Sequence, residues 1–247
     1  MGQSFFIWNG IDCRSMGVLM QGPAPIVRPE ERVNHVQIPG RSGDLTETEG
    51  ENIYNSYIQT VTIMVKGGYR VRDVYRWLRG AGYVTFSGEP DKRQKARIIG
   101  AVTLNKHSYN LDWWVGEVQF YCQPLKELLT DSTETVSTSG DTVRNNGDVH
   151  SRPMYKITPS GTSVMLSVGY TPEGANAGTV TSLVIAGTTS GTVIWVDSDT
   201  MEVWNAAKTE LLTAASAGDF PQLGPGDNTI QGSGWSSIEI EKRERFL

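Results

Sequence analysis

The sequence predicts a mainly β protein with one α-helix. From Tyr83 onward, turn signals recur roughly every eight to twelve residues between short stretches rich in Thr and β-branched residues, which is typical of sandwiches and barrels. Only one stretch of the chain has the apolar spacing of a helix. No reactive side chains cluster as they do in active sites, so the pattern favours a structural or binding protein over an enzyme.

The composition indicates a folded chain without a membrane segment. Hydrophobic residues make up 38% and charged residues 20% of the 247 residues, and 27 Gly with 11 Pro suit a turn-rich β protein. No apolar run reaches the roughly 18 residues that a membrane helix needs. The first six residues lack the basic start and apolar stretch of a signal peptide. We therefore expect synthesis in the cytoplasm and no membrane insertion.

The two halves of the chain carry opposite net charge. Residues 1–130 hold 15 Lys+Arg and 13 Asp+Glu, whereas residues 131–247 hold 7 and 14, within a total of −5. The contrast predicts two domains, 1–130 and 131–247, with different neighbours. A net charge this small gives no reason to expect nucleic-acid recognition.

Short strands joined by tight turns open the first domain. Asn9-Gly10 is the strongest two-residue hairpin signal, and residues 39–44 supply two glycines for another turn. The polar, acidic stretch 47–55 predicts an exposed loop, and the mixed stretch 123–134 predicts the linker. The predicted strands are 4–8, 11–14, 18–20, 33–38, 57–66, 83–87, 95–104 and 112–122.

One helix is predicted at about residues 70–80. Apolar residues recur there at i, i+3, i+4 and i+7, the spacing of one helix face. Gly80 and Gly82 supply a C-terminal stop. The residues of the apolar stripe are Val71, Val74, Tyr75 and Leu78.

Residues 131–247 have the texture of a β-sandwich or jelly roll. Every segment is short and β-like, and residues 197–200 form a clear hairpin turn. Another tight turn is predicted at 223–228. The predicted strands are 154–157, 163–168, 179–186, 192–196, 201–204, 229–231 and 235–241.

Few residues of this chain suggest chemistry. Asp197 and Asp199 sit at the hairpin tip, where Asp side chains bond nearby backbone amides; a calcium site and an acid–base pair are the alternatives. The three histidines, His35, His107 and His150, are too scattered for metal ligation. Cys13 and Cys122 are expected as reduced thiols, and whether they meet in space stays open. We predict no catalytic, cofactor-binding or metal-binding residue.

Arginines and one tryptophan are the candidate subunit-interface residues. Arg72, Arg76 and Arg79 lie off the apolar stripe, so they form either a solvated face or a docking surface for an acidic neighbour such as the second half of another copy. In a strand, Trp113 and Trp114 must point to opposite faces. One is expected to pack under the helix, which leaves the other for an interface or for stacking on a sugar ring. The predicted interface residues are Arg72, Arg76, Arg79 and Trp113.

Several stretches together resemble a known family. The runs "FFIWNGIDCRSMGV", "IPGRSGDL", "GYVTFSGEPDKRQKARI" and "EVQFYCQP" are similar to the N-terminal domain of phage distal tail proteins of long-tailed, non-contractile phages. The runs "NGDVHSRPMYKI", "VIWVDSDTMEVWN" and "GDFPQLGPGDNTI" resemble strand–turn units of their C-terminal galectin-like sandwich. The resemblance keeps the family's order over nearly the whole chain.

The resemblance implies an architecture and a place in a virion. It implies a β-barrel-like N-terminal domain with one helix, followed by a galectin-like β-sandwich. It implies a homohexameric ring at the distal end of the tail, made in the host cytoplasm, that joins the tail tube protein to the tail-tip hub, or baseplate hub, and serves host adsorption. In many relatives the ring would carry receptor-binding proteins. No inserted carbohydrate-binding module is apparent in the sandwich, and the fold alone confers no lectin activity.

Two other classes of protein remain as alternatives. A carbohydrate-binding, lectin-like module would use an exposed tryptophan and polar neighbours on one sheet face to recognise host glycans. A hydrolase on a jelly roll is less favoured, because strand parity places no pair of carboxylates together. The sequence therefore favours a structural virion component without an enzymatic activity or a cofactor.

Overall fold

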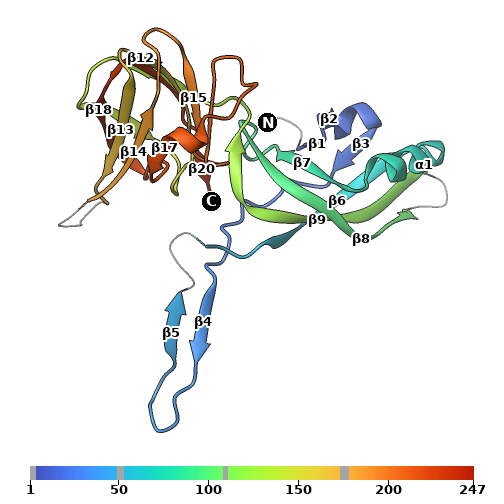
Figure 1. The fold of residues 1–247 in the computed structure, drawn as a ribbon. Coiled ribbons are helices and arrows are strands. Elements are labelled where there is room, and N and C mark those ends of the chain that lie inside the picture. Colours follow the sequence, from blue (N-terminus) through green and yellow to red (C-terminus); the bar gives the residue numbers. More distant parts are fainter. Residues whose placement is uncertain (1–3, 49–52, 108–110, 173–177) are drawn as a thin grey trace. The chain divides into compact units, whose positions relative to one another are not determined.

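The chain folds into two units built from strands, shown in Figure 1. The computed structural model describes residues 4–48, 53–107, 111–172 and 178–247. Contacts divide the chain into residues 1–129 with Leu247, here called unit 1, and residues 130–246, here called unit 2. In the described part, α1 (Gly68–Trp77) is the one α-helix. The predicted mainly β fold class with a single helix is confirmed.

Unit 1 is a curled antiparallel sheet, a half-barrel, with the helix on its concave side (Figure 1). The strand order is β2-β1-β7-β8-β9-β6-β3. The helix begins two residues earlier than predicted and ends at Trp77, because Leu78 leaves the helical conformation. The strands are β1 (Phe6–Trp8), β2 (Ile11–Asp12), β3 (Val18–Met20), β6 (Tyr57–Lys66), β7 (Ala81–Phe86), β8 (Lys92–Lys106) and β9 (Trp113–Leu128).

The first hairpin forms as predicted, but the strand that follows is shorter. Asn9 and Gly10 both adopt positive φ, 50° and 79°, as the tight turn between twisted strands requires. The prediction of a strand over 11–14 is wrong beyond Asp12, because residues 13–16 form the 3-10 helix η1 (Cys13–Met16). The Asp12 carboxylate accepts a hydrogen bond from the Arg14 backbone N–H at 2.8 Å and so caps this turn.

The core of unit 1 lies between the sheet and the helix. Alternate residues of β6 face inward, so Val61, Ile63 and Val65 are buried. Aromatic rings surround Phe120, with Phe6 and Trp8 each 5.5 Å away between ring centroids. The helix contributes Val74, which is fully buried, and Leu78 follows it into the core. Two predicted stripe residues are less buried, since Tyr75 is 39% exposed and Val71 is half-buried.

Strand β9 extends beyond its predicted end. Residues 123–128 were assigned to the linker by their proline and charge, but they continue the strand and pair with β8. Lys126 is buried there because its ammonium donates to Glu89 at 2.6 Å and to the Leu247 carbonyl at 3.1 Å. A buried, paired lysine cannot be told from an exposed one by sequence. The linker prediction for 123–128 is therefore wrong.

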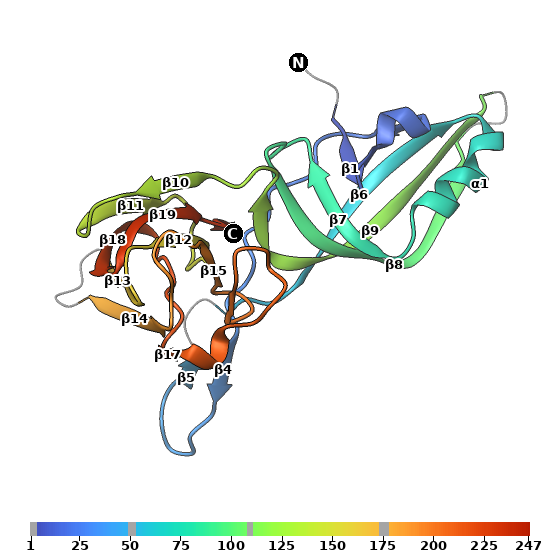
Figure 2. The same ribbon diagram turned by 45° about the horizontal axis from the view of Figure 1, so that its top comes forward.

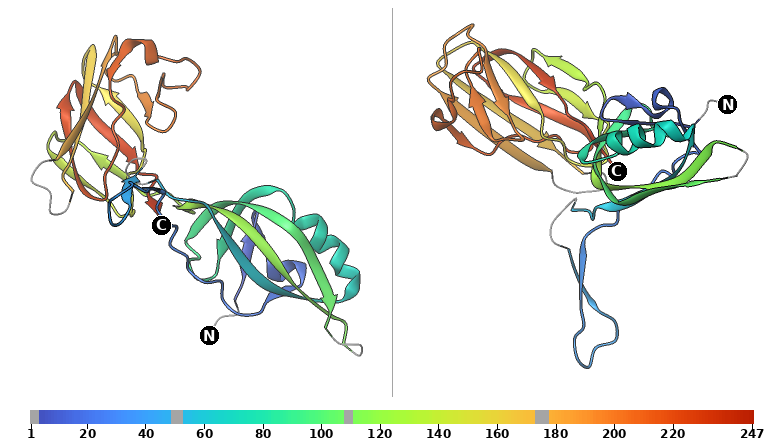
Figure 3. Two further views of the ribbon diagram at one scale, coloured as in Figure 1. Left: turned by 90° about the horizontal axis from the view of Figure 1, so that it is seen from below. Right: turned by 90° about the vertical axis from the view of Figure 1, so that its right-hand side faces the viewer.

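A two-stranded arm, residues 30–55, extends away from the half-barrel (Figures 1 and 3). It consists of β4 (Val33–Val36) and β5 (Leu45–Thr48), which pair antiparallel. At its base the Arg32 N–H donates to Ile53 O and the Asn55 N–H donates to Glu30 O. The predicted loop at 47–55 is thus wrong for residues 47 and 48, which belong to β5. Residues 49–52 lie outside the described residues.

Unit 2 is a sandwich of two five-stranded antiparallel sheets, seen in Figure 2. One sheet has the order β10-β19-β12-β15-β16 and the other β11-β18-β13-β14-β17. Its strands are β10 (Thr133–Val136), β11 (Asp141–Asn145), β12 (Met154–Pro159), β13 (Ser163–Tyr170), β14 (Thr179–Ala186), β15 (Ile194–Asp197), β16 (Glu202–Trp204), β17 (Ser216–Gly218), β18 (Gly226–Ser233) and β19 (Trp235–Glu241). A short 3-10 helix, η2 (Thr213–Ala215), precedes β17, and β20 (Arg245–Phe246) ends the unit.

Both sheets of unit 2 supply one shared core. Tyr155, Ile157 and Ile238 come from the first sheet, and Leu166 and Ile185 from the second, and all are buried. Buried and exposed residues alternate along these strands, as expected for two sheets packed face to face. The Tyr155 hydroxyl lies inside the core, where it donates to the Pro221 carbonyl at 3.3 Å. Unit 2 thus has a closed interior of its own.

Candidate interaction surfaces

The described residues contain no cluster suited to metal binding. No group of three or more His, Cys, Asp or Glu side chains converges in the part of the chain that the structure describes. Cys13 and Cys122 are both free thiols in the core of unit 1, and burial raises the pKa of Cys122 to about 12. His35 and His107 are exposed, and the His150 ring packs against Tyr170. Surfaces are therefore the candidates for function.

The predicted arginines lie on the solvent side of the helix. Arg72, Arg76 and Arg79 are all exposed, and Arg76 forms a single ion pair with Asp73 at 3.3 Å, in which both side chains are more than 60% exposed. Exposed pairs of this kind add little stability. The arrangement leaves the guanidinium groups accessible, and their role in an interface stays a prediction.

Trp113 and Trp114 point in opposite directions, as expected from adjacent strand positions. Trp114 packs against the core and its indole N–H donates to Asp112 at 3.0 Å. Trp113 is half-buried on the other face, where the Lys66 ammonium lies 5.9 Å from its ring centroid. Among the described residues, no hydrogen bond, ion pair or ring contact joins Trp113 to the three arginines, so the structure does not gather the four predicted interface residues into one cluster.

Asp112 holds the first turn of the helix. Its carboxylate accepts the Gly68 backbone N–H at 3.0 and 3.1 Å, although the helix has no capping side chain of its own. The hydrogen bond from Gly68 and then that from the Trp114 indole hold the pKa of Asp112 below its usual range. An anion at this end of a helix also complements the helix dipole.

The arm is a surface without an interior. No described residue from Glu30 to Glu47 is buried, and the apolar side chains of Val36 and Ile38 are 44% and 39% exposed. An isolated two-stranded hairpin is marginally stable at best in water. An arm of this kind is expected to be completed by contacts with another chain.

A hollow of about 510 Å³ lies on the outer face of the half-barrel, opposite the core. It is lined by small residues of β7 and by cations and tyrosines of β7, β8 and β9. Register places Arg97 beside Tyr121, and Tyr121 beside Ile58. The residues that define the hollow are Ala81, Gly82, Tyr83, Lys95, Arg97 and Tyr121.

Sequence reasoning missed this hollow, although a signal was present. Lys95 and Arg97 are two residues apart in a predicted strand, which places both on one face. Tyr121 has the parity opposite to the apolar face of the strand at 112–122. What the sequence does not show is that Arg97 pairs with Tyr121, which places the cations of β8 beside this tyrosine of β9.

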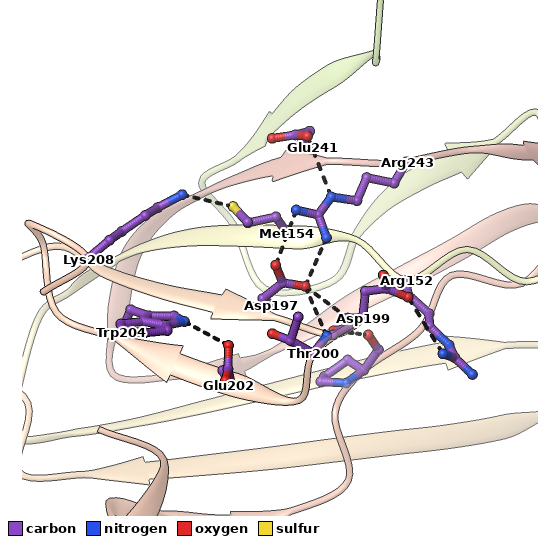
Figure 4. A network of polar contacts seen from close by, with 12 residues as sticks. Arg152, Met154, Asp197, Asp199, Thr200, Glu202, Trp204, Lys208, Glu241 and Arg243 are labelled. Carbon is purple, nitrogen blue, oxygen red and sulfur yellow. Dashed lines mark hydrogen bonds and ion pairs between the residues drawn. The ribbon is translucent and has the colours of Figure 1, made fainter. Parts of the chain in front are cut away.

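Figure 4 shows a polar network on the outer face of the first sheet of unit 2. The Asp197 carboxylate accepts two hydrogen bonds from the Arg243 guanidinium, at 2.8 and 3.2 Å, and one from the Asp199 backbone N–H at 2.9 Å. Burial alone would raise the pKa of Asp197, but the Arg243 and backbone hydrogen bonds outweigh it and lower that pKa. Asp199 faces Arg152 at 3.6 Å.

These contacts show what Asp197 does in the hairpin. Its Oδ1 accepts from Arg243 and from the backbone N–H groups of Asp199 and Thr200, and its Oδ2 accepts from Arg243, so the carboxylate stabilises the turn. Asp197 and Asp199 thus act locally in the hairpin.

Two tryptophans lie side by side on the same sheet face. Trp195 and Trp204 are directly opposite each other on β15 and β16, and both are half-buried. Their indole N–H groups already donate, to Ala206 O and to Glu202 respectively. The Lys208 ammonium lies 3.8 Å from the Trp195 ring centroid and covers that ring. This tryptophan pair is the feature that a glycan-binding role would use.

Comparison with known proteins adds one structural likeness over the full chain. No protein-family model matches the chain, and no curated protein sequence matches it. The fold is similar to the crystal structure of SPP1 Dit (gp 19.1), described as a paradigm of the hub adsorption apparatus in phages that infect Gram-positive hosts. The likeness has a TM-score of 0.78, covers 100% of both chains and has 18% sequence identity. The chain therefore has the fold of a phage Dit protein from end to end.

Proposed function

We propose that the chain is a structural subunit of a phage tail tip. In this role, copies assemble into a closed six-membered ring at the distal end of the tail, which joins the tail tube to the tail-tip hub and the host-adsorption apparatus. The observation that carries the proposal is the likeness to SPP1 Dit across both units, in the order that the sequence resemblance implies. The chain acts by shape in this role and carries out no reaction.

The division into two units supports this role. Unit 1 has an arm whose described residues 30–47 are never buried, so it offers the element that contacts between copies need. Closed cyclic symmetry requires two different complementary surfaces on each copy. Unit 2 has a closed core and is suited to present its outer faces to other tail proteins, receptor-binding proteins among them.

Sizing chromatography with light scattering tests the proposal. We expect the purified chain to elute as an assembly of about six copies, with the fraction assembled rising with concentration. A protein that stays monomeric at every concentration up to the millimolar range, and that fails to bind tail tube protein, would contradict it.

A second candidate function is recognition of host glycans by unit 2. The observation that favours it is the pair Trp195 and Trp204 on an outer sheet face, since tryptophan rings stack on sugars. Against it, the Lys208 ammonium occupies the space over Trp195. Binding of the purified chain to host cell-wall polysaccharide that is lost in Trp195→Ala and Trp204→Ala would favour this function, whereas no retention of either variant or wild type would exclude it.

A further inference from the structure

We propose that the arm of one copy docks in the hollow on the outer face of the half-barrel of a neighbouring copy. The inference rests on the proposed ring and names the contact that would build it. Both surfaces belong to unit 1.

The hollow has the composition of an interface centre. Arg97, Tyr121 and Ile58 follow one another across β8, β9 and β6, and Tyr121 and Ile58 remain 40% and 53% exposed. Arginine and aromatic residues are enriched where interfaces are strongest. Ala81 lies next to Arg97 in the ladder, so a small residue leaves space beside the guanidinium. An inserted side chain could thus be surrounded by apolar, aromatic and cationic atoms.

Positive charge in the hollow is incompletely balanced. Arg97 has no ion-pair partner among the described residues. Lys95 reaches Glu127 only at 3.9 Å, and the same carboxylate also pairs with Arg93 at 3.3 Å. The Arg93 guanidinium additionally lies 4.6 Å from the Tyr83 ring centroid. The Glu127 carboxylate is therefore shared by Lys95 and Arg93. The Arg97 guanidinium is left for an acidic group of a partner.

The arm carries the complementary charge. Residues 30–55 contain six Asp and Glu residues and two arginines. Glu47 of β5 is exposed and forms no ion pair in the described part of the chain. It lies opposite Asn34, two positions from the pair Val36 and Leu45, so a carboxylate and apolar side chains are close together. The carboxylate of the arm is complementary in charge to the cation of the hollow, and the apolar side chains of the arm can pack against its tyrosines.

The arm also has the reach that a neighbouring copy requires. The six residue steps from Arg32 to Ile38 span at most about 20 Å at the strand rise of roughly 3.3 Å per residue. The described residues of the arm up to Glu47 are exposed or half-buried, so this part of the arm has no enclosed core. The complementary charges of the arm and the hollow make a second copy of the chain the occupant.

A charge-swap cycle tests the contact. Arg97→Glu and Glu47→Arg are each expected to raise the concentration needed for half-assembly at least tenfold at low salt. The double variant Arg97→Glu with Glu47→Arg is expected to restore most of the loss, which a general disturbance of either surface would not do. Lys208→Glu, at an exposed cation of unit 2, is the matched control and should assemble like wild type.

A cysteine trap provides an independent readout. With Val36→Cys and Ile58→Cys in one chain, mild oxidation of the assembled protein is expected to give a ladder of covalent multimers. The native thiols are buried, so each single cysteine variant should give none. Circular dichroism melting of each variant, made before its assembly is measured, checks that the variant is folded.

The outcomes separate this contact from the proposed function. If wild type forms rings and both charge variants assemble normally, the docking site is wrong and the ring stands. If Arg97→Glu disrupts rings but Glu47→Arg does not, and the double variant is not rescued, the hollow takes another acidic surface and the arm proposal falls. If wild type forms no assembly under any condition, the proposed function itself is contradicted.

Discussion

The two units differ in how completely they bury their own surfaces. Unit 2 closes its core between two sheets, with Tyr155, Leu166 and Ile238 fully buried. Unit 1 has one curled sheet closed by a helix, and from it projects an arm in which no described residue up to Glu47 is buried. Unit 2 thus encloses its strands around one core, whereas the described part of the arm of unit 1 has no buried residue. We therefore expect the proposed assembly to depend on unit 1.

Removing the arm should have the largest effect on assembly. A variant in which Arg32 is joined to Ile53 by a Gly-Asn-Gly turn keeps the hydrogen-bonded base of the arm, where the Arg32 N–H donates to Ile53 O at 2.9 Å. We expect this variant to be monomeric at concentrations where wild type assembles, with a melting temperature within a few degrees of wild type. Light scattering gives the mass and calorimetry the stability. If the variant still assembles, the arm of unit 1 is not needed for contacts between copies, and the contrast drawn between the two units is wrong.

Core truncations should show that each unit has an interior of its own. Leu78→Ala in unit 1, where Leu78 is 4% exposed, and Leu166→Ala in unit 2, where Leu166 is fully buried, are each expected to cost about 2–5 kcal/mol of unfolding free energy. Hydrogen exchange read by mass spectrometry should show faster exchange mainly in the unit that carries the change. A loss under about 1 kcal/mol for Leu78→Ala would mean that the helix end is not packed as described.

Loss of the Asp197 charge should destabilise unit 2 by a smaller amount. Asp197→Asn leaves Arg243 without the carboxylate that it contacts at 2.8 Å, and we expect a cost of about 1.5–3 kcal/mol. The control is Asp199→Asn, because the pair of Asp199 with Arg152 spans 3.6 Å and both side chains are about half exposed; it should cost less than about 0.5 kcal/mol. Equal costs for the two variants in urea melts would contradict the assigned roles.

Acid should weaken both units through carboxylates whose pKa is lowered in the folded state, Glu89 of unit 1 and Asp197 of unit 2 among them. Burial alone would raise the pKa of Glu89 in unit 1, but the hydrogen bonds from Lys126 and Lys92 outweigh it and lower that pKa; the pKa of Asp197 in unit 2 is lowered likewise. A carboxyl group with a lowered pKa in the folded state stabilises fully above its unfolded value, 4.5 for Glu89 and 3.8 for Asp197, and loses this contribution as the pH falls through the lowered pKa. In melts between pH 7 and 2, the stability of the protein should therefore fall below about pH 4.5. In Asp197→Asn, unit 2 should lose less stability on acidification than it does in wild type. An unchanged acid profile in that variant would count against this linkage.

Charge reversal on the helix should have the smallest effect on stability. Arg72→Glu with Arg76→Glu is expected to change the unfolding free energy by less than about 0.5 kcal/mol, because the only ion pair involved is exposed. Its effect on assembly at low salt shows whether the helix face is a second contact between copies. Assembly identical to wild type would remove Arg72 and Arg76 from the candidate interface residues.

Strand alternation is what made much of this fold predictable. The bounds of β6, β14 and β19 match the expected strands residue for residue, because apolar residues alternate there with polar ones along a half-buried sheet. The C-terminal part of β9 was missed because Lys126 looks solvated in sequence and is buried only by virtue of Glu89, which is 37 residues away. β5 was missed because both faces of this strand lie toward solvent, so its sequence lacks the alternation of apolar and polar residues that predicts a strand.

The candidate surfaces were harder to predict than the strands. Exposed arginines on the helix could be read from their position relative to the apolar stripe. The hollow at Arg97 and Tyr121 depends on the register of three strands, and register is set by long-range pairing that a single sequence does not specify. In the arm, a strand at 33–38 and a turn at 39–44 were predicted, but the return strand β5 was not, so the paired hairpin was missed.

Electron microscopy of the purified chain, with the arm-deleted variant prepared at the same concentration, tests the central claim most directly. We expect negative-stain class averages of wild type to show annular particles with sixfold symmetry, and those of the arm-deleted chain to show only isolated single particles. Isolated wild-type particles across the whole concentration range, or annuli that persist without the arm, would contradict it.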